Sequence, residues 1–413
     1  MRRSFLLGAT AAMAVACSAE NDPPPNGPGT GGTSGSGGSV ATGGVSSGGA
    51  AATGGGGPSG GTGGVGATGG SGGAGGTGGT VTGGTGGVVT GGSGGTAGSA
   101  GANTGGSAGT GGTPATGFSC PPGSEALTVD LAQLSPPVVN GAPPAGLEGS
   151  FNLEGPVWID GVLYLSEIGG GSPPPVARIL SHTPGGGVQV FIADSGTNGL
   201  AVDADGALYG ASHKDGSISR FDVSNPAAAP VVVASMYDGK RFNSPNDLAI
   251  RSDGNIYFSD PTWQAPQPPP QADARVYRIP AGGGAVEVVD DTIDQPNGVL
   301  LTKDENTLYV GGSGGLWKFS IMDGGAVGSG TRIDVINGGV DGLAKDCAGN
   351  LYVTNGQRVA VLNASDTSIG EINVGANVTN VAFGGAENRT LFITSMQPPA
   401  LRQVELNVPG YPY

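Results

Sequence analysis

The sequence predicts an all-β fold, a six-bladed β-propeller preceded by a disordered glycine-rich tether. A strand-like unit recurs six times in the last two-thirds of the chain, at intervals of roughly 40–50 residues, which is the spacing of propeller blades. No long stretch repeats its apolar residues with the 3.6-residue period of a helix, and Gly or Pro interrupts the sequence every few residues. A helical protein is therefore excluded.

Residues 1–17 are predicted to be an export signal. Two arginines precede a short apolar segment, which is too short for a bilayer because a spanning helix needs about 20 apolar residues. Val15-Ala16-Cys17 resembles the lipobox of bacterial lipoproteins, in which the cysteine is lipidated. We therefore expect an exported protein, lipid-anchored through Cys17 in a bacterial cell envelope. A plain secretory signal is the alternative, and the paired arginines also fit twin-arginine export.

Residues 18–117 are predicted to be a disordered linker. They consist almost entirely of Gly, Thr, Ser, Ala and Pro, and such a segment cannot bury enough apolar surface to offset the loss of chain entropy. A glycine-rich chain of this length has a root-mean-square reach of about 50–60 Å. A glycine-rich fibre is the competing interpretation, but no strict Gly-X-Y period supports collagen. The composition favours a spacer.

Residues 118–413 remain for one folded domain, which is long enough to bury a closed core. The linker carries little charge, so the formal net charge of −15 belongs mainly to this domain. An acidic surface argues against nucleic acid and anionic lipid as partners. We expect a monomer that meets the membrane only through the N-terminal lipid.

Two of the three cysteines lie in the folded domain. Cys120 is near its beginning, and Cys347 is in the turn of the fifth unit. Disulfides persist in an exported protein, so a bond between Cys120 and Cys347 is one interpretation. Two unrelated small buried residues are the other.

Each repeated unit begins with a polar residue, which we call its opener. An apolar run, a turn rich in Asp, Gly and Asn, and an aliphatic–aromatic pair follow. Asn-Gly and Asp-Gly also favour tight hairpin turns, so a single opener could be part of a turn. The recurrence of one register favours inner strands instead, whose openers point toward the axis at one mouth of the channel. The six openers are Glu154, Asn198, Asn246, Asn297, Asp341 and Asn380.

The openers supply two carboxylates and several amide carbonyls, with no positive charge at matching positions. Two buried carboxylates near each other repel, and a divalent cation removes that cost. An all-oxygen ligand set favours Ca²⁺ over Mg²⁺, Mn²⁺ or Zn²⁺. The chain has only two histidines, which further weakens a zinc site or a Ser-His-Asp triad.

Residues 239–261, which include Ser244-Pro-Asn246-Asp, resemble the gluconolactonase and senescence-marker-protein (regucalcin-like) family of six-bladed propellers. Glu154-Gly-Pro-Val-Trp, Gln295-Pro-Asn297-Gly and Val340-Asp341-Gly-Leu are similar to other signatures of that family. The resemblance covers residues 118–413. It implies that Glu154, Asn297 and Asp341 hold a divalent metal, that Asn246 contacts the metal or the substrate, and that Asp341 is the general base.

The sequence departs from the family at two positions near the expected site. Ser212-His213 stands where gluconolactonases often have Glu-His, and Ser244 replaces the arginine that precedes the Asn of regucalcin-like members. Arg241 is a candidate to reach the same rim. A proline-rich stretch at residues 264–271 is either a lid over the mouth or an ordinary surface loop.

The expected activity is metal-assisted hydrolysis of a lactone or a related ester. The metal would polarise the carbonyl, Asp341 would act as the base, and the substrate-binding candidates are Asn246, Asn198, His213 and Arg241. One alternative is a phosphotriesterase, as in paraoxonase-like propellers with similar calcium sites. Another is a propeller that binds a surface and catalyses nothing, because one fold serves many functions.

Overall fold

The computed structural model describes residues 119–411. The predicted signal with Cys17 and the linker 18–117 lie outside these residues. Within them the all-β prediction is confirmed, since only three short 3₁₀ turns accompany the strands, namely η1 (Ser124–Ala126), η2 (Leu131–Gln133) and η3 (Asp323–Gly325). No helix in the described range is long and apolar enough to cross a membrane.

Four antiparallel sheets contain four strands each, in sequence order. The sheet of the second unit contains β6 (Thr197–Val202), β7 (Leu208–Ser212), β8 (Ser217–Phe221) and β9 (Val231–Ala234). The third contains β12 (Leu248–Ile250), β13 (Ile256–Asp260), β14 (Arg275–Ile279) and β15 (Glu287–Asp290). The fourth contains β16 (Val299–Leu301), β17 (Thr307–Gly312), β18 (Gly315–Ser320) and β19 (Thr331–Arg332). The fifth contains β20 (Leu343–Lys345), β21 (Leu351–Asn355), β22 (Arg358–Leu362) and β23 (Ser368–Asn373).

The first and sixth units share one eight-stranded sheet. The first unit contributes β2 (Asn152–Ile159), β3 (Val162–Ile168), β4 (Ala177–His182) and β5 (Val188–Ile192). The sixth contributes β24 (Asn377–Gly384), β25 (Thr390–Met396), β26 (Ala400–Glu405) and β1 (Val138–Gly141). The two halves are joined by the pairing of Asn152 with Met396. A separate two-stranded ribbon contains β10 (Met236–Tyr237) and β11 (Lys240–Arg241).

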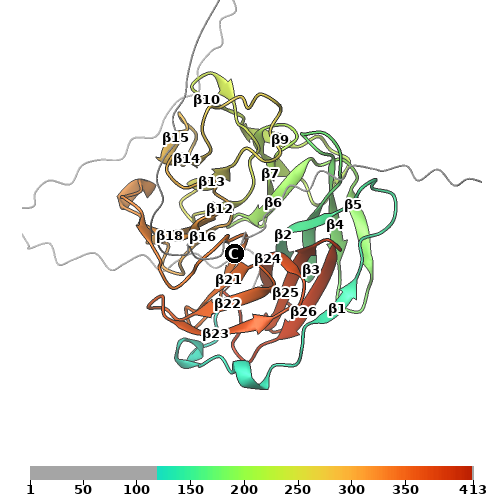
Figure 1. Ribbon diagram of the computed structural model, residues 1–413, viewed down its shortest axis with the longest axis vertical. Coiled ribbons are helices and arrows are strands. Elements are labelled where there is room, and N and C mark those ends of the chain that lie inside the picture. Colours follow the sequence, from blue (N-terminus) through green and yellow to red (C-terminus); the bar gives the residue numbers. More distant parts are fainter. Residues whose placement is uncertain (1–118, 412–413) are drawn as a thin grey trace, which may run out of the picture. The chain divides into compact units, whose positions relative to one another are not determined.

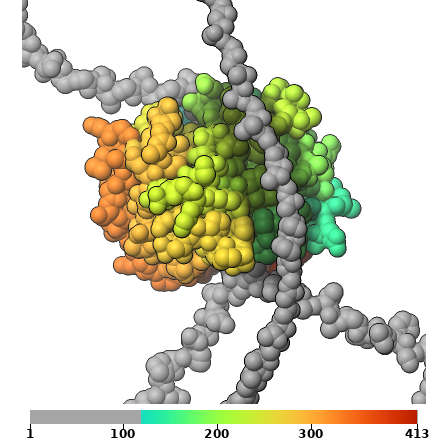
Figure 2. All heavy atoms as spheres, turned by 90° about the horizontal axis from the view of Figure 1, so that it is seen from above, coloured from blue at the N-terminus to red at the C-terminus, as the bar shows by residue number. Residues whose placement is uncertain are grey.

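The first strands of the units form a closed ring. Strand β2 contacts β6, and the contacts continue through β12, β16, β20 and β24 back to β2. Figure 1 shows the sheets arranged around this centre. Strand β1, from the start of the described chain, pairs with β26 from its end, so residues far apart in sequence complete one sheet. In Figure 2 the middle units, coloured green through yellow to orange, pack into one continuous surface.

The hydrophobic core lies between neighbouring sheets. The cluster between the second and third units, for example, is built around Phe242, Phe258 and Tyr277, whose ring centroids lie 4.9–5.3 Å apart. Aromatic rings at these distances contribute about 0.5–1.5 kcal/mol per pair beyond the area that they bury. Each sheet is therefore held by its neighbours, and the ring positions all the first strands together.

Glycines next to the openers let the first strands approach closely. The N–H of Gly199 donates to the carbonyl of Asn246 at 2.6 Å, and that of Gly298 donates to the carbonyl of Asp341 at 2.8 Å. A Cβ on Gly298 would overlap the Asp341 carbonyl oxygen. The Asn-Gly and Asp-Gly pairs are thus required by contacts between units, and the turn interpretation of the openers is wrong.

The predicted register of the sixth unit is wrong by one residue. The N–H of Gly342 donates to the carbonyl of Thr379 at 2.7 Å, the bond that openers accept elsewhere in the ring. Asn380 instead matches Asp247, because the side chain of each accepts the N–H of the following residue. Thr379 is therefore the structural opener. Its hydroxyl donates to the Leu153 carbonyl at 2.5 Å and does not add a free oxygen to the mouth.

The channel is closed at the end away from the openers. A cavity of only about 70 Å³ remains inside the ring, lined by apolar residues of the first strands, by Asp247 and Asn380, and by Glu305, Lys345 and Tyr411. The N–H of Tyr411 donates to the Lys345 carbonyl at 3.0 Å, and the Lys345 ammonium lies 4.6 Å from the centre of the Tyr411 ring.

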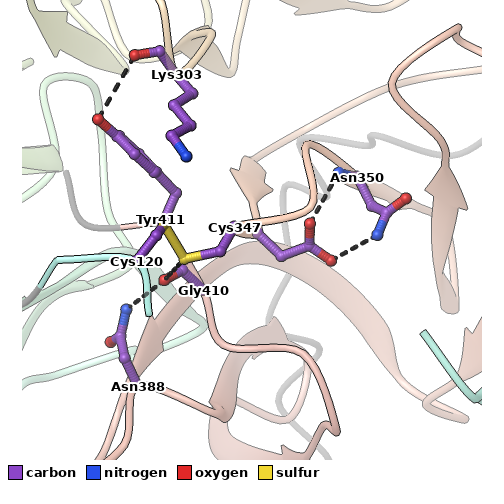
Figure 3. Close-up of a disulfide and its surroundings, with 8 residues drawn as sticks. Cys120, Lys303, Cys347, Asn350, Asn388, Gly410 and Tyr411 are labelled. Atoms are coloured by element: carbon purple, nitrogen blue, oxygen red, sulfur yellow. Dashed lines mark hydrogen bonds between the residues drawn. A yellow bond between two sulfur atoms is a disulfide. The ribbon is translucent and has the colours of Figure 1, made fainter. Parts of the chain in front are cut away.

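Cys120 and Cys347 form a disulfide at the closed end, with Cα atoms 5.6 Å apart (Figure 3). Cys347 follows β20, which runs from the Asp341 side toward the closed end. The Cys347 N–H donates to the Pro409 carbonyl at 2.8 Å, and the Asn388 amide donates to the Gly410 carbonyl at 2.8 Å. The beginning and the end of the described chain are thus held to the fifth unit.

Candidate functional site

Two carboxylates, the buried Glu154 and the half-buried Asp341, lie close enough at the mouth of the ring to interact electrostatically. Burial raises the pKa of both, and the negative charge of Asp341 raises the pKa of Glu154 further. Asp247 follows the opener Asn246, and its carboxylate also raises the pKa of Glu154 and of Asp341. Its own pKa is raised to about 6 by burial. The structure therefore places three acidic side chains close together in a region with little water, where the charged form of each is disfavoured.

Several buried oxygens around these carboxylates accept no hydrogen bond. They are Oδ1 of Asp341, Oδ1 of Asn198 and Oδ1 of Asn152. A buried acceptor without a partner costs about 1–3 kcal/mol, so such groups usually have a ligand or water that compensates. These oxygens thus lack hydrogen-bond donors or cations among the described residues.

Glu154 and Asp341 are held in place by amide side chains. The amide of Asn152 donates to Oε1 of Glu154 at 3.0 Å, and the side chain of Asn297 donates to Asp341. Asn152 also ends the first unit's sheet where it meets Met396, which fixes its backbone. The structure therefore brings together Glu154, Asn297 and Asp341, which the sequence predicted as ligands, and adds Asn152, which it did not.

The chain before Asn246 is shaped by a further buried carboxylate, Asp260. It accepts the N–H of Asn243 at 2.9 Å and the N–H of Ser244 at 2.7 Å. Burial raises the pKa of Asp260 to about 7. Asn246 itself is buried, and its N–H donates to the Ser259 carbonyl at 2.9 Å. Asp260 thus positions the segment that carries Asn246.

The proline-rich stretch reaches the mouth. Gln264 accepts a hydrogen bond from the Asn198 amide at 3.2 Å, so this predicted substrate contact already has a protein partner. Thr262 is fixed by Gln295, which lies just before Asn297 and accepts the Thr262 N–H at 2.9 Å. Trp263, between them, lines a cavity together with Asn297 and Asp341. The stretch therefore borders the site.

His213 and Arg241 serve neighbouring loops. His213 is fully buried, with Nε2 2.9 Å from the Pro175 carbonyl oxygen, and burial lowers its pKa to about 4, so it is neutral at pH 7. Arg241 donates to the backbone carbonyls of residues 213, 214 and 215 at 2.7–3.1 Å. Its Nε and Nη2 donors thus hold the turn after β7, and a role for Arg241 in binding substrate stays a prediction.

A cleft of about 790 Å³ opens from the site over the fifth unit. Asn297, Asp341 and Trp263 line its inner part, and the hairpin between β21 and β22 lines its outer part. Pockets that bind small molecules generally have about 300–1,000 Å³. The cleft is large enough for a small molecule beside Asp341, which lines it.

The oxygen-rich mouth fits a hard divalent cation. Glu154 and Asp341 supply negative charge, Asn297 lies between units beside Asp341, and the unpartnered oxygens of Asp341 and Asn198 lack a positive partner. No group of three or more His, Cys, Asp or Glu side chains in residues 119–411 is arranged to hold a metal. A cation held by Glu154 and Asp341 would thus need further oxygen ligands, which amide side chains such as that of Asn297 can supply.

Residues 153–397 match the family model described as the SMP-30/Gluconolactonase/LRE-like region. The chain belongs to this family. The match includes every predicted metal ligand, from Glu154 to Asp341, and it confirms the resemblance inferred from the sequence.

Relatives and solved structures agree with the family assignment. A gluconolactonase of Zymomonas mobilis is 29% identical over 277 residues, which cover 59% of this chain and 75% of that protein. The lactonohydrolase oryL of Aspergillus oryzae is 27% identical over 187 residues, 38% of this chain and 43% of that protein, so the match spans less than half of that relative. A gluconolactonase structure from Xanthomonas campestris is 30% identical, with a TM-score of 0.56, and covers 68% of this chain and 98% of its own.

A calcium-binding regucalcin from Agrobacterium tumefaciens has the same fold. It is 17% identical, with a TM-score of 0.53, over 68% of this chain and 96% of that chain. Family membership thus rests on the matched region and on the gluconolactonase relatives, and the regucalcin likeness adds the fold.

Proposed function

We propose that this protein is a divalent-metal-dependent lactonase whose reaction centre is the mouth formed by Glu154 and Asp341. The observation that carries the proposal is the pair of mutually repelling carboxylates, with a buried and unpartnered Oδ1 on Asp341. Membership in a family that includes gluconolactonases supplies the reaction class. We interpret the six four-stranded groups as the blades of one propeller in residues 118–413.

Glu154, Asn297, Asp341 and Asn246 would hold the metal, with Ca²⁺ favoured. When bound, it supplies Lewis acidity to the lactone carbonyl and compensates the charge of the two carboxylates. Asp341 would accept a proton from the attacking water through its free Oδ1. The new C–O bond forms at the carbonyl carbon, the ring C–O bond breaks, and the departing alkoxide takes up a proton to give the hydroxy acid.

The remaining residues would bind and orient the substrate. Asn246 would contact the substrate or the metal, and Asn198 would become available to the substrate when its bond to Gln264 opens. Neutral His213 would hold the rim loop rather than move a proton. The closed end of the channel limits the entry of substrate and water to the opener side.

We further propose that the protein is exported and anchored through a lipid on Cys17, with residues 18–117 as a spacer. Labelling with a radioactive fatty acid tests the anchor, because incorporation is expected for the natural chain and lost in Cys17→Ser. Incorporation that persists in Cys17→Ser would refute it.

The activity test uses the full chain and a panel of lactones, with phosphotriesters as a second panel. Each substrate is measured after EDTA treatment and again after addition of Ca²⁺, Mg²⁺, Mn²⁺ or Zn²⁺. We expect lactone hydrolysis that EDTA abolishes and a divalent ion restores. Phosphotriester turnover without lactone turnover would favour the paraoxonase-like alternative, and no turnover of either panel would favour a non-catalytic binding protein.

A further inference from the structure

The outer part of the 790 Å³ cleft is lined mainly by amide side chains. Beyond Asp341 and Asn297 it runs over the β21–β22 hairpin and the end of β23. Four amide side chains line it, are exposed, and form no hydrogen bond with other described residues. They are Asn337, Gln357, Asn373 and Asn377. An amide both donates and accepts, which matches the donor and acceptor character of a hydroxyl group.

The charges in this part of the cleft are paired. Arg358 donates to Glu371 at 3.1 Å and to the side-chain amide oxygen Oδ1 of Asn355 at 3.2 Å. Both members of the pair are about half exposed, so solvent and salt weaken their bond, but together they leave no net charge on the cleft floor. A charged substituent on the ligand would find no uncompensated partner here. The outer cleft therefore favours a neutral, hydroxyl-rich ligand.

The walls of the cleft are fixed within the protein. Asn355 donates to the carbonyls of Asn337 at 3.1 Å and Gly339 at 2.8 Å, which ties the loop before Asp341 to the hairpin. The half-exposed indole of Trp263 adds an apolar ring in the inner part of the cleft. An apolar ring and several amides in one cleft suit a sugar, whose ring has apolar C–H faces and a polar edge.

We propose that the substrate is a lactone that carries at least one further neutral sugar unit, as in the lactone of a disaccharide aldonic acid. The lactone ring lies at Asp341 and Asn297, and the second sugar lies over Gln357 and Asn373. The volume supports this arrangement, because the cleft is in the upper part of the range for small-molecule pockets and exceeds the needs of one six-membered ring. The inference rests on the proposed lactonase function and adds the class of its substrate.

The first test compares two substrates in the full chain. The ratio of kcat/KM for cellobiono-δ-lactone or maltobiono-δ-lactone to that for glucono-δ-lactone is expected to exceed one. In the double variant Gln357→Ala/Asn373→Ala this ratio is expected to fall about tenfold, because two hydrogen bonds to the second sugar are lost. The matched control is Gln189→Ala, whose exposed side chain lies on β5 away from the cleft and should leave the ratio unchanged. An unchanged ratio in the double variant, or a natural ratio below one, would overturn the inference.

The second test needs no turnover. Titration calorimetry with the disaccharide alditols cellobiitol and maltitol should show binding of at least one to the natural protein and weaker binding to the double variant, while sorbitol binds less well. Alditol binding that depends on Gln357 and Asn373 in a protein that hydrolyses no lactone would support the cleft and refute the lactonase function. Lactone hydrolysis with no alditol binding would leave the function in place and refute the second sugar.

Discussion

Gly298 lies directly against Asp341. Its N–H donates to the Asp341 carbonyl at 2.8 Å, and the space in which a Cβ would stand is filled by that carbonyl oxygen. The residue after one opener thereby fixes the backbone of the next opener around the ring. The carboxylate proposed to act as the base is positioned by a neighbouring strand that carries no reactive group.

Replacement of Gly298 by Ala should therefore damage both stability and activity. The added methyl group forces the fourth and fifth units apart, and such overpacking typically costs about 1–3 kcal/mol. A displacement of Asp341 by about 1 Å should reduce kcat about 10²-fold. Urea denaturation and lactone kinetics measure the two effects. Gly187→Ala is the control, because a Cβ there meets nothing within 4 Å; equal behaviour of the two variants would contradict the role of Gly298.

Asp341→Asn should abolish lactone turnover and leave the metal-free protein at least as stable. Loss of a general base typically reduces the rate about 10²–10⁴-fold. The substitution also removes a buried charge that repels Glu154 and Asp247, so the free energy of unfolding without metal should not fall. Exposed Asp291→Asn is the control for both measurements. Retained turnover in Asp341→Asn would remove the proposed base.

Asp260 should make stability decrease as the pH rises from about 4 to 7. Its pKa is about 7 in the folded protein and about 3.9 when unfolded, so between these values the folded state binds more protons. The contribution of Asp260 to the free energy of unfolding is full below pH 4, is lost through pH 7, and is constant above it. Denaturation at pH 5 and pH 8 should show a smaller difference in Asp260→Asn than in the natural protein. Equal differences would show that Asp260 is ionised throughout.

Arg241→Gln is expected to act on stability more than on substrate binding. Three backbone carbonyls of residues 213–215 lose a charged donor, at a cost of about 1–3 kcal/mol. Exposed Arg220→Gln, on β8, is the matched control and should change neither quantity. A raised KM for lactone at unchanged stability would restore Arg241 to the substrate contacts that the sequence suggested.

Cys120→Ser should lower the free energy of unfolding substantially. The disulfide joins residues 227 positions apart, and in the chain-entropy model a cross-link over so long a loop contributes about 5 kcal/mol. Cys347→Ser should lower stability by a similar amount, and the double variant should lose little more than either single one. Fully additive losses would mean that the two sulfurs act independently.

The repeated units predicted the all-β fold and the joint position of Glu154, Asn297 and Asp341, because each opener precedes an apolar strand of similar register. The register of the sixth unit failed for a physical reason. Asn380 resembles an opener in sequence, but it occupies the position after the opener. Asp247 is its equivalent in the third unit, because the side chain of each accepts the N–H of the following residue. The parallel between Thr379-Asn380 and Asn246-Asp247 was the available signal.

Contacts made by long loops could not be predicted from the pattern. The bond of Gln264 to Asn198, and the use of Arg241 to hold the turn after β7, depend on where irregular segments fold back. Asn152 was missed because it precedes the repeated motif. Its hydrogen bond to Glu154 is known only once the structure shows that the two side chains of strand β2 point to the same side.

The bond between Cys120 and Cys347 also fixes the start of the described chain at the end of the domain away from Asp341. Residue 119 joins the domain beside the plugged pole, whereas Asp341 opens on the opposite pole. An attachment through the N-terminal side would therefore lie away from Asp341. Fixing the protein to a bead through its N-terminal end should consequently leave its turnover intact.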